Sequence, residues 1–150
     1  MRIVFMGTPD FAVPCLAELL EAGHQVCGVF TQPDKPKGRG HKLLPPPVKE
    51  TAMAHNIEVR QPTTFKNNEG GIAYLKALAP ELIVGAAYGK ILPPRVLNIP
   101  LRGCINVHGS LLPKYRGAAP IQWAVLNGDK ITGVTIMQMA DGIDTGDMLA

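Results

Sequence analysis

Asn106 and His108 are the residues of this sequence whose types and spacing are best suited to chemistry. They follow a short apolar run that begins at Cys104, and alternate residues of an extended strand point to the same side. An imidazole titrates near neutral pH and an amide donates hydrogen bonds, so the pair suits the transfer of a polar group. The sequence therefore predicts a site where this strand ends.

The loop after His108 has features of a ligand-binding loop. Gly109 removes a side chain next to the histidine and allows a ligand or another backbone to approach closely. Ser110–Pro113 turns the chain, and Lys114 and Arg116 are positively charged. Because ligands of open α/β sheets collect at the carboxyl ends of the strands, we expect the site at that edge.

Each candidate also has a structural interpretation. An asparagine after a strand is usually a turn former, and a single histidine is usually on the surface or a hydrogen-bonded core residue. We interpret His24, His41 and His55 as structural, because they lack comparable neighbours. None of the four histidines has ligand spacing with a cysteine or an acid, so we expect no metal.

The composition indicates one ordinary globular domain of 150 residues with 46% apolar residues and a formal net charge of +3. The three cysteines are an odd number without CxxC spacing, which is typical of reduced thiols in a cytoplasmic protein. The N-terminus has no signal-peptide pattern, and no stretch is long and apolar enough to span a membrane.

Short apolar runs alternate with helical patterns along the chain, which predicts an α/β fold. We expect a Rossmann-like, mostly parallel sheet with helices on both faces. Asp10 is a candidate N-cap for the first helix, and the absence of GxGxxG argues against a dinucleotide site. The most apolar run, Glu81–Ala87, should be central in the sheet. The expected strands are Arg2–Met6, Gln25–Thr31, Ile57–Val59, Glu81–Ala87, Gly103–Val107 and Gly133–Met139, and the later helices are Pro45–Asn56, Gly70–Leu78, Pro93–Leu97 and Ala118–Leu126.

Two further segments have a structural and a functional interpretation. Gln32–Lys42 is a basic Pro/Gly-rich stretch, and a solvated mobile loop or a contact with a phosphate backbone explains it. Tyr88–Pro93 follows the expected central strand at the same edge as Asn106, where Tyr88 is a packing residue or part of a pocket wall.

Asn106–Gln122, which reads NVHGSLLPKYRGAAPIQ, resembles the signature of the folate-dependent formyltransferase family. The resemblance extends over essentially the whole chain through MGTPDFA, TQPDKPKGRG, AAYGKILP and TGVTIMQMADGIDTGDML. It is strongest to the branch that formylates methionyl-initiator-tRNA for translation initiation. The branches that act on glycinamide ribonucleotide usually have proline where this chain has Gly109 and lack the basic loop, and the UDP-sugar branch diverges after HGSLLPKYRG.

The resemblance implies an enzyme with the formyltransferase fold that uses 10-formyltetrahydrofolate as co-substrate and no metal. It implies acyl transfer, with Asn106 donating to the oxyanion and His108 moving the proton. A carboxylate should orient the imidazole; the residues alone leave Asp141, Asp144 and Asp147 open, and the family match indicates Asp144. The implied folate contacts are Tyr88, Gly89, Ile91, Leu92, Ser110, Leu111, Leu112 and Pro113, and the implied tRNA contacts are Lys35, Lys37, Arg39 and Lys42.

Residues 1–150 should form the N-terminal catalytic domain of a monomeric enzyme. The chain stops at Met148–Ala150, at what resembles the start of a strand, so we expect an incomplete domain without a C-terminal tRNA-binding domain. Two alternatives stay open. One is a formyltransferase with a UDP-sugar or glycinamide ribonucleotide acceptor, and the other is an inactive fragment that binds folate or RNA.

Overall fold

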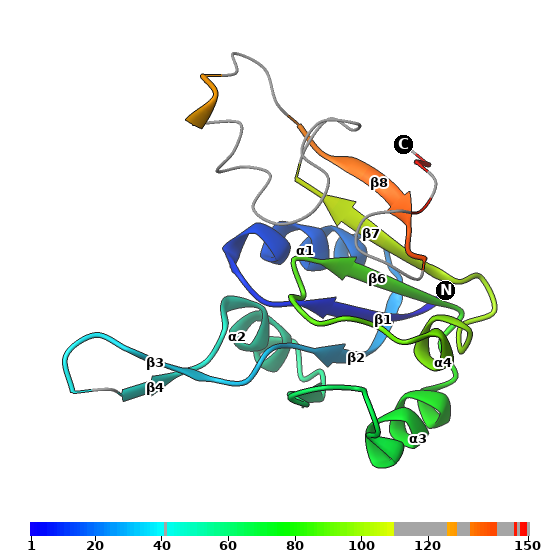
Figure 1. The fold of residues 1–150 in the computed structure, drawn as a ribbon, viewed down its shortest axis with the longest axis horizontal. Helices are drawn as coiled ribbons and strands as arrows, with labels where there is room; N and C mark the ends of the chain where they lie inside the picture. The colour runs from blue at the N-terminus through cyan, green and yellow to red at the C-terminus, as the bar shows by residue number, and fades with distance from the viewer. Residues whose placement is uncertain (41, 110–125, 129–132, 141–145, 147, 150) are drawn as a thin grey trace.

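A six-stranded sheet forms the centre of this computed structural model, which describes residues 1–40, 42–109, 126–128, 133–140, 146 and 148–149 (Figure 1). The strand order is β5-β2-β1-β6-β7-β8, and all neighbours are parallel except β7 and β8. The predicted mostly parallel sheet is confirmed, with β6 next to β1 at its centre. The strands are β1 (Arg2–Gly7), β2 (Gln25–Phe30), β5 (Val59–Arg60), β6 (Leu82–Ala86), β7 (Cys104–His108) and β8 (Thr135–Gln138).

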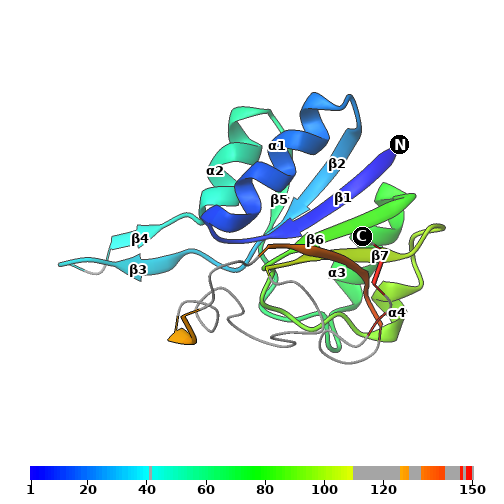
Figure 2. The same ribbon diagram turned by 90° about the horizontal axis from the view of Figure 1, so that it is seen from above.

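Helices cover both faces of the sheet, as expected (Figure 2). One face carries α1 (Val13–Glu21) and α2 (Pro47–Ala54), and the other carries α3 (Glu69–Leu78) and α4 (Pro94–Leu97). A proline within the first two positions of α1, α2 and α4 favours a helix start, because its fixed φ matches the helix.

The N-cap predicted at Asp10 is wrong. A 3-10 turn, η1 (Asp10–Ala12), precedes α1, whose N-cap is Ala12, so the α-helix begins two residues later than the sequence suggested. Neither element has a capping side-chain hydrogen bond. At α3, in contrast, the Asn68 side chain accepts a 2.8 Å hydrogen bond from the backbone N–H of Gly71.

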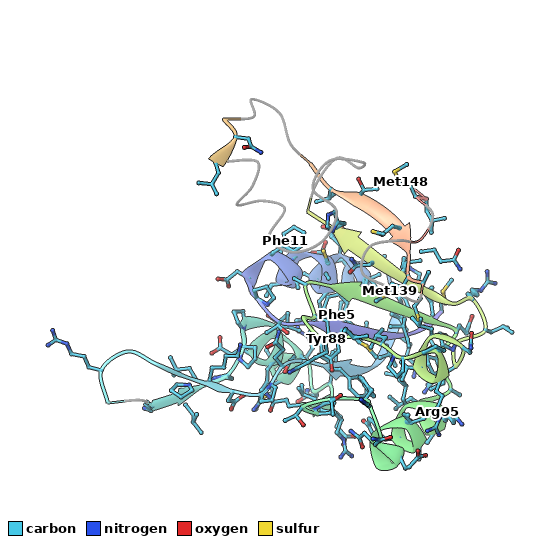
Figure 3. The ribbon with its side chains drawn as sticks, in the orientation of Figure 1. Phe5, Phe11, Tyr88, Arg95, Met139 and Met148 are labelled. Carbon is cyan, nitrogen blue, oxygen red and sulfur yellow. The ribbon has the colours of Figure 1, made fainter. Side chains whose placement is uncertain are left out.

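Two apolar clusters fill the space between the sheet and its helices. Along β1 the side chains alternate between them: Ile3 and Phe5 pack toward α1 and α2, while Val4 and Met6 pack toward α3 and α4. Figure 3 labels Phe5 within this centre. The sheet is thus buried on both faces, which explains why its strands read as continuous apolar runs.

The basic segment forms a hairpin rather than the expected loop. β3 (Lys35–Lys37) and β4 (Lys42–Leu44) pair antiparallel in a separate sheet that projects from the body (Figures 1 and 2). Gly38 at φ +72° and Gly40 at φ +91° adopt the left-handed backbone that lets the chain reverse. The loop prediction failed because proline and glycine are rare in strands, yet Pro36 lies within the pairing of β3 and β4.

The C-terminal part is described only in pieces. The predicted helix over Ala118–Leu126 lies outside the described residues except for Leu126. Met148 forms an isolated antiparallel bridge with Met137 of β8, and the Leu149 N–H donates to the Ile136 carbonyl at 2.7 Å. Over the ranges that the structure describes, no helix has the length and apolar character needed to cross a membrane.

Candidate active site

Asn106 and His108 lie on the same face of β7. Cys104 packs into the cluster beneath α3 and α4, whereas Ile105 and Val107 pack against the opposite cluster. Alternation along the strand therefore places Asn106 and His108 on the face of Cys104. Asn106 is half-buried and His108 is 4% exposed. Both groups are therefore partly shielded from water, and charge interactions are stronger in such an environment than in water.

A glycine of the neighbouring strand makes room for the Asn106 amide. Asn106 is paired with Gly85 of β6. A Cβ atom built on Gly85 would lie 3.3 Å from Asn106 Oδ1 and 3.6 Å from Met139 Sδ. Sequence reasoning missed Gly85, although a glycine inside the most apolar strand is a recognised sign of close approach.

A pocket of about 580 Å³ lies on the same face, near the start of β7. Its walls include Leu97 of α4, Cys104 of β7 and Met139 just after β8; Met139 is labelled in Figure 3. Met139 also lies 3.6 Å from the Cβ position of Gly85, so one wall residue of the pocket is next to the space that Gly85 leaves for the Asn106 amide. The volume is in the range of small-molecule sites. Of the predicted folate contacts that the structure describes, none lines this pocket.

The predicted folate contacts after β6 differ in exposure. The Tyr88 ring is buried in the core, 6.5 Å from the Phe65 ring, and burial raises the pKa of its phenol. Leu92 is buried in the same cluster, whereas Ile91 is 73% exposed. The remaining predicted contacts, Ser110, Leu111, Leu112 and Pro113, lie outside the described residues.

The backbone of Tyr88 joins three strand ends. Its carbonyl oxygen accepts hydrogen bonds from Thr8 Oγ1, which follows β1, and from Gln32 Nε2, which follows β2, both at 3.0 Å. The backbone N–H of Gln32 donates to Thr8 Oγ1 at 3.2 Å. Gly89, at φ +82°, has no Cβ, and a Cβ there would overlap the Gln32 amide. Nothing in the local sequence pattern indicates this network.

β8, which precedes the acidic loop, is antiparallel to β7. Asp144, which the family resemblance implies as the partner of His108, follows β8 in the chain. In the structure β8 runs the other way, so its last residue, Gln138, pairs with Ile105 rather than with His108. Gly146 returns against the backbone of Gln138. Asp144 itself lies outside the described residues, as do Asp141 and Asp147.

The predicted tRNA contacts belong to the projecting hairpin. Lys35, Arg39 and Lys42 are exposed, and Lys37 is paired with Lys42 across the two strands. The hairpin lies beyond the edge at which β1, β2 and β6 end (Figure 1). Lys35, Arg39 and Lys42 are thus presented to solvent beyond this edge of the sheet, where a polyanion can reach them.

The cysteines are free thiols. Burial raises the pKa of Cys104 to about 12, and it also raises the pKa of Cys15 and Cys27. Thiols with raised pKa values are poor nucleophiles at neutral pH. Among the described residues, no three side chains of His, Cys, Asp or Glu gather into a group that could hold a metal ion.

Residues 1–150 match the family described as Formyl transferase. The chain is 62% identical over 149 residues to the methionyl-tRNA formyltransferase of Pelotomaculum thermopropionicum and 61% identical over 149 residues to that of Acetivibrio thermocellus. These alignments cover 99% of this chain but 47% and 48% of the two relatives. The chain thus spans about half the length of the curated relatives it matches.

Solved structures share the fold. A phosphoribosylglycinamide formyltransferase from Bacillus halodurans superposes with a TM-score of 0.77 at 24% identity, covering 100% of this chain and 77% of that chain. A sugar N-formyltransferase from a Shewanella species gives 0.68 at 21% identity, covering 100% and 55%. The predicted formyltransferase fold is therefore confirmed, and the match over residues 1–150 shows that this chain belongs to the formyl transferase family.

Proposed function

We propose that the complete protein transfers a formyl group from 10-formyltetrahydrofolate to the α-amino group of methionyl-initiator-tRNA, for translation initiation. The observation that carries this proposal is the 62% identity, over nearly the whole chain, to a relative named methionyl-tRNA formyltransferase. Residues 1–150 then belong to the N-terminal catalytic domain, and the protein is a cytoplasmic monomer that needs no metal and has no membrane partner. The arrangement on β7 supports the chemistry, and the basic hairpin supports a polyanionic acceptor.

Asn106 and His108 are the proposed catalytic residues. The amine nitrogen attacks the formyl carbon, a new C–N bond forms, and the bond from that carbon to N10 of the folate breaks. One proton leaves the amine and one arrives at N10. Asn106 donates its amide N–H to the oxygen as negative charge develops, and His108 carries the proton. Asp144 is the proposed partner that orients the imidazole.

For the folate we retain the contacts expected from the sequence and add the pocket lined by Leu97, Cys104 and Met139. Tyr88, Gly89, Ile91, Leu92 and Ser110–Pro113 remain the proposed contacts. The pocket near Cys104 and Met139 has a volume in the range of small-molecule sites, and Met139 connects it to the space next to the Asn106 amide.

Lys35, Lys37, Arg39 and Lys42 are the proposed contacts to the tRNA phosphate backbone. Each such contact releases counterions, so tRNA affinity should fall steeply with salt. Arg39→Ala should lower the salt slope by about one unit and leave folate binding unchanged. An unchanged salt slope would argue against a phosphate contact at this residue.

The amine that accepts the formyl group distinguishes the proposed function from its alternatives. The complete protein should be assayed with 10-formyltetrahydrofolate and three amines: methionyl-initiator-tRNA, glycinamide ribonucleotide and a UDP-amino sugar. We expect formylation of the tRNA alone. Transfer to one of the two small acceptors, with none to the tRNA, would replace the proposed function.

A further inference from the structure

A polar cluster joins the base of the hairpin to the body of the protein. Lys49 Nζ, on α2, donates to Asp34 Oδ1 at 3.1 Å, to Asp34 Oδ2 at 3.2 Å and to Gln61 Oε1 at 2.9 Å. Gln61 Nε2 donates to Asp34 Oδ1 at 2.7 Å and to the Gln32 carbonyl at 3.0 Å. We refer to Asp34, Lys49 and Gln61 as the base cluster.

The base cluster connects both ends of the hairpin. Asp34 directly precedes β3, and β4 continues through Pro45 and Pro46 into α2, which carries Lys49. Gln61 directly follows β5, so the third member belongs to the main sheet. The ion pair thus closes the hairpin at its base, and Gln61 attaches that closure to the edge of the sheet.

The base cluster is partly shielded from solvent. The side chains of Lys49 and Asp34 are 21% and 28% exposed, so water screens them less than a fully exposed pair. The Gln61 amide and then the Lys49 ammonium lower the pKa of Asp34, which keeps the carboxylate charged. Asp34 also accepts three of these hydrogen bonds. A network of several hydrogen bonds restricts the orientation of the hairpin more than a single contact would.

Apolar packing does not hold the outer part of the hairpin. Leu43 and Leu44 of β4 are 62% and 41% exposed, so they do little to fix its direction. Two paired strands alone are marginally stable in water. The direction in which the hairpin leaves the sheet therefore depends on its base.

We propose that Asp34, Lys49 and Gln61 are positioning residues, which fix the direction of the hairpin and thereby place the acceptor tRNA relative to Asn106 and His108. This inference rests on the proposed function. The base cluster need not touch the tRNA. It acts by keeping the cations of the hairpin in one place, so that less freedom is lost when the tRNA binds.

Asp34→Ala separates positioning from simple electrostatics. The substitution removes a negative charge next to a basic hairpin, so charge alone would tighten the binding of a polyanion. Positioning predicts the opposite result, because the Lys49 and Gln61 side chains lose their shared acceptor. Lys49→Met should weaken tRNA binding on either view, and Lys49→Arg should restore much of it by keeping the ion pair.

The experiment is steady-state formylation by the complete protein. Asp34→Ala and Lys49→Met should each raise KM for methionyl-tRNA by about tenfold, the equivalent of one lost charged interaction, with kcat and KM for 10-formyltetrahydrofolate unchanged. The double variant should be little worse than either single one, since both remove the same pair. A lower or unchanged KM for tRNA in Asp34→Ala overturns the inference.

Arg95→Met is the control for the loss of an ion pair elsewhere in the protein. It breaks another ion pair, in which Arg95 Nη1 and Nη2 lie 2.6 and 2.8 Å from the Glu69 carboxylate, at the end of the molecule away from the hairpin (Figure 3). We expect no change in KM for tRNA. A rise equal to that of Asp34→Ala would show a general loss of structure and overturn the positioning role.

Hydrogen exchange tests the base cluster independently of the acceptor. In Asp34→Ala, amides of residues 35–44 should exchange faster than in the parent protein, while those of β1 and β6 should not change. If the parent protein formylates a different amine, the proposed function fails, and the exchange result still decides whether the cluster orders the hairpin. Unchanged exchange over residues 35–44 overturns the inference whatever the acceptor is.

Discussion

Gln32 Nε2 donates a 3.0 Å hydrogen bond to the backbone carbonyl oxygen of Tyr88. Gln32 lies two residues before Asp34 at the base of the hairpin, and Tyr88 begins the segment of proposed folate contacts. This hydrogen bond therefore joins the segment of proposed folate contacts to the base of the hairpin that carries the proposed tRNA contacts. The approach of these two residues requires a glycine at position 89.

Gly89→Ala and Gln32→Ala should be non-additive in stability. Gly89→Ala introduces a Cβ at φ +82° that overlaps the Gln32 amide, so we expect a loss of about 2 kcal/mol or more. Gln32→Ala removes a hydrogen bond and should lose about 1 kcal/mol. In the double variant the overlap is absent, so the total loss should be smaller than the sum. Urea unfolding measures all three, and strict additivity would show that the two residues do not compete for space.

Asn106→Ala and His108→Ala should lower kcat by orders of magnitude. Loss of an oxyanion donor typically lowers kcat about 10²- to 10³-fold, and loss of an acid–base group about 10²- to 10⁴-fold. His55→Ala is the control, because His55 is exposed at the end of α2, on the opposite face of the sheet, and its Nδ1 lies 2.9 Å from the Thr51 carbonyl oxygen. Single-turnover formylation measures the rate of formyl transfer in each variant. A His108→Ala enzyme with more than a tenth of the parent rate would remove His108 from the proposed mechanism.

Gly85→Ala should reduce activity with little loss of stability. The added methyl group would stand 3.3 Å from Asn106 Oδ1, so the amide must shift by a few tenths of an ångström. Since a misplacement of about 1 Å can lower a rate about 10²-fold, we expect kcat to fall about threefold to tenfold. Gly70→Ala on α3 is the control, because nothing lies within 4 Å of its Cβ position. Equal kcat values for the two variants would mean that Asn106 tolerates the shift.

Local patterns in the sequence predict the strands and the shared face of Asn106 and His108. Apolar runs mark β1, β2 and β6 because these strands are buried on both faces, and alternation along β7 needs no tertiary information. The antiparallel direction of β8 was not predicted, because strand partners and register depend on contacts between distant segments. The hairpin was not predicted because its proline and glycine residues favour turns over strands.

The supporting network of the site depends on distances across the fold. Gly85 lies next to Asn106, and Gln32 reaches Tyr88, through pairings separated by 21 and 56 positions in the chain. The base cluster likewise unites segments before β3, after β5 and on α2. A single sequence contains these residues but not their neighbours, so it indicates the reacting groups more readily than the residues that position them.

Tyr88→Phe should reduce the sensitivity of the protein to alkaline pH. Burial raises the pKa of Tyr88 above its ordinary value of about 10, so above that pH the unfolded chain loses a proton that the folded protein keeps. The unfolded state then binds fewer protons, and the free energy of unfolding falls as pH rises, by up to about 1.4 kcal/mol per pH unit. Between pH 9.5 and 11 the parent protein should lose about 1 kcal/mol more than Tyr88→Phe. At pH 7 the variant should be equally or more stable, because Tyr88 Oη is buried without a hydrogen-bond partner in the described part of the chain. Urea unfolding at both pH values measures this, and parallel pH profiles for the two proteins would contradict the prediction.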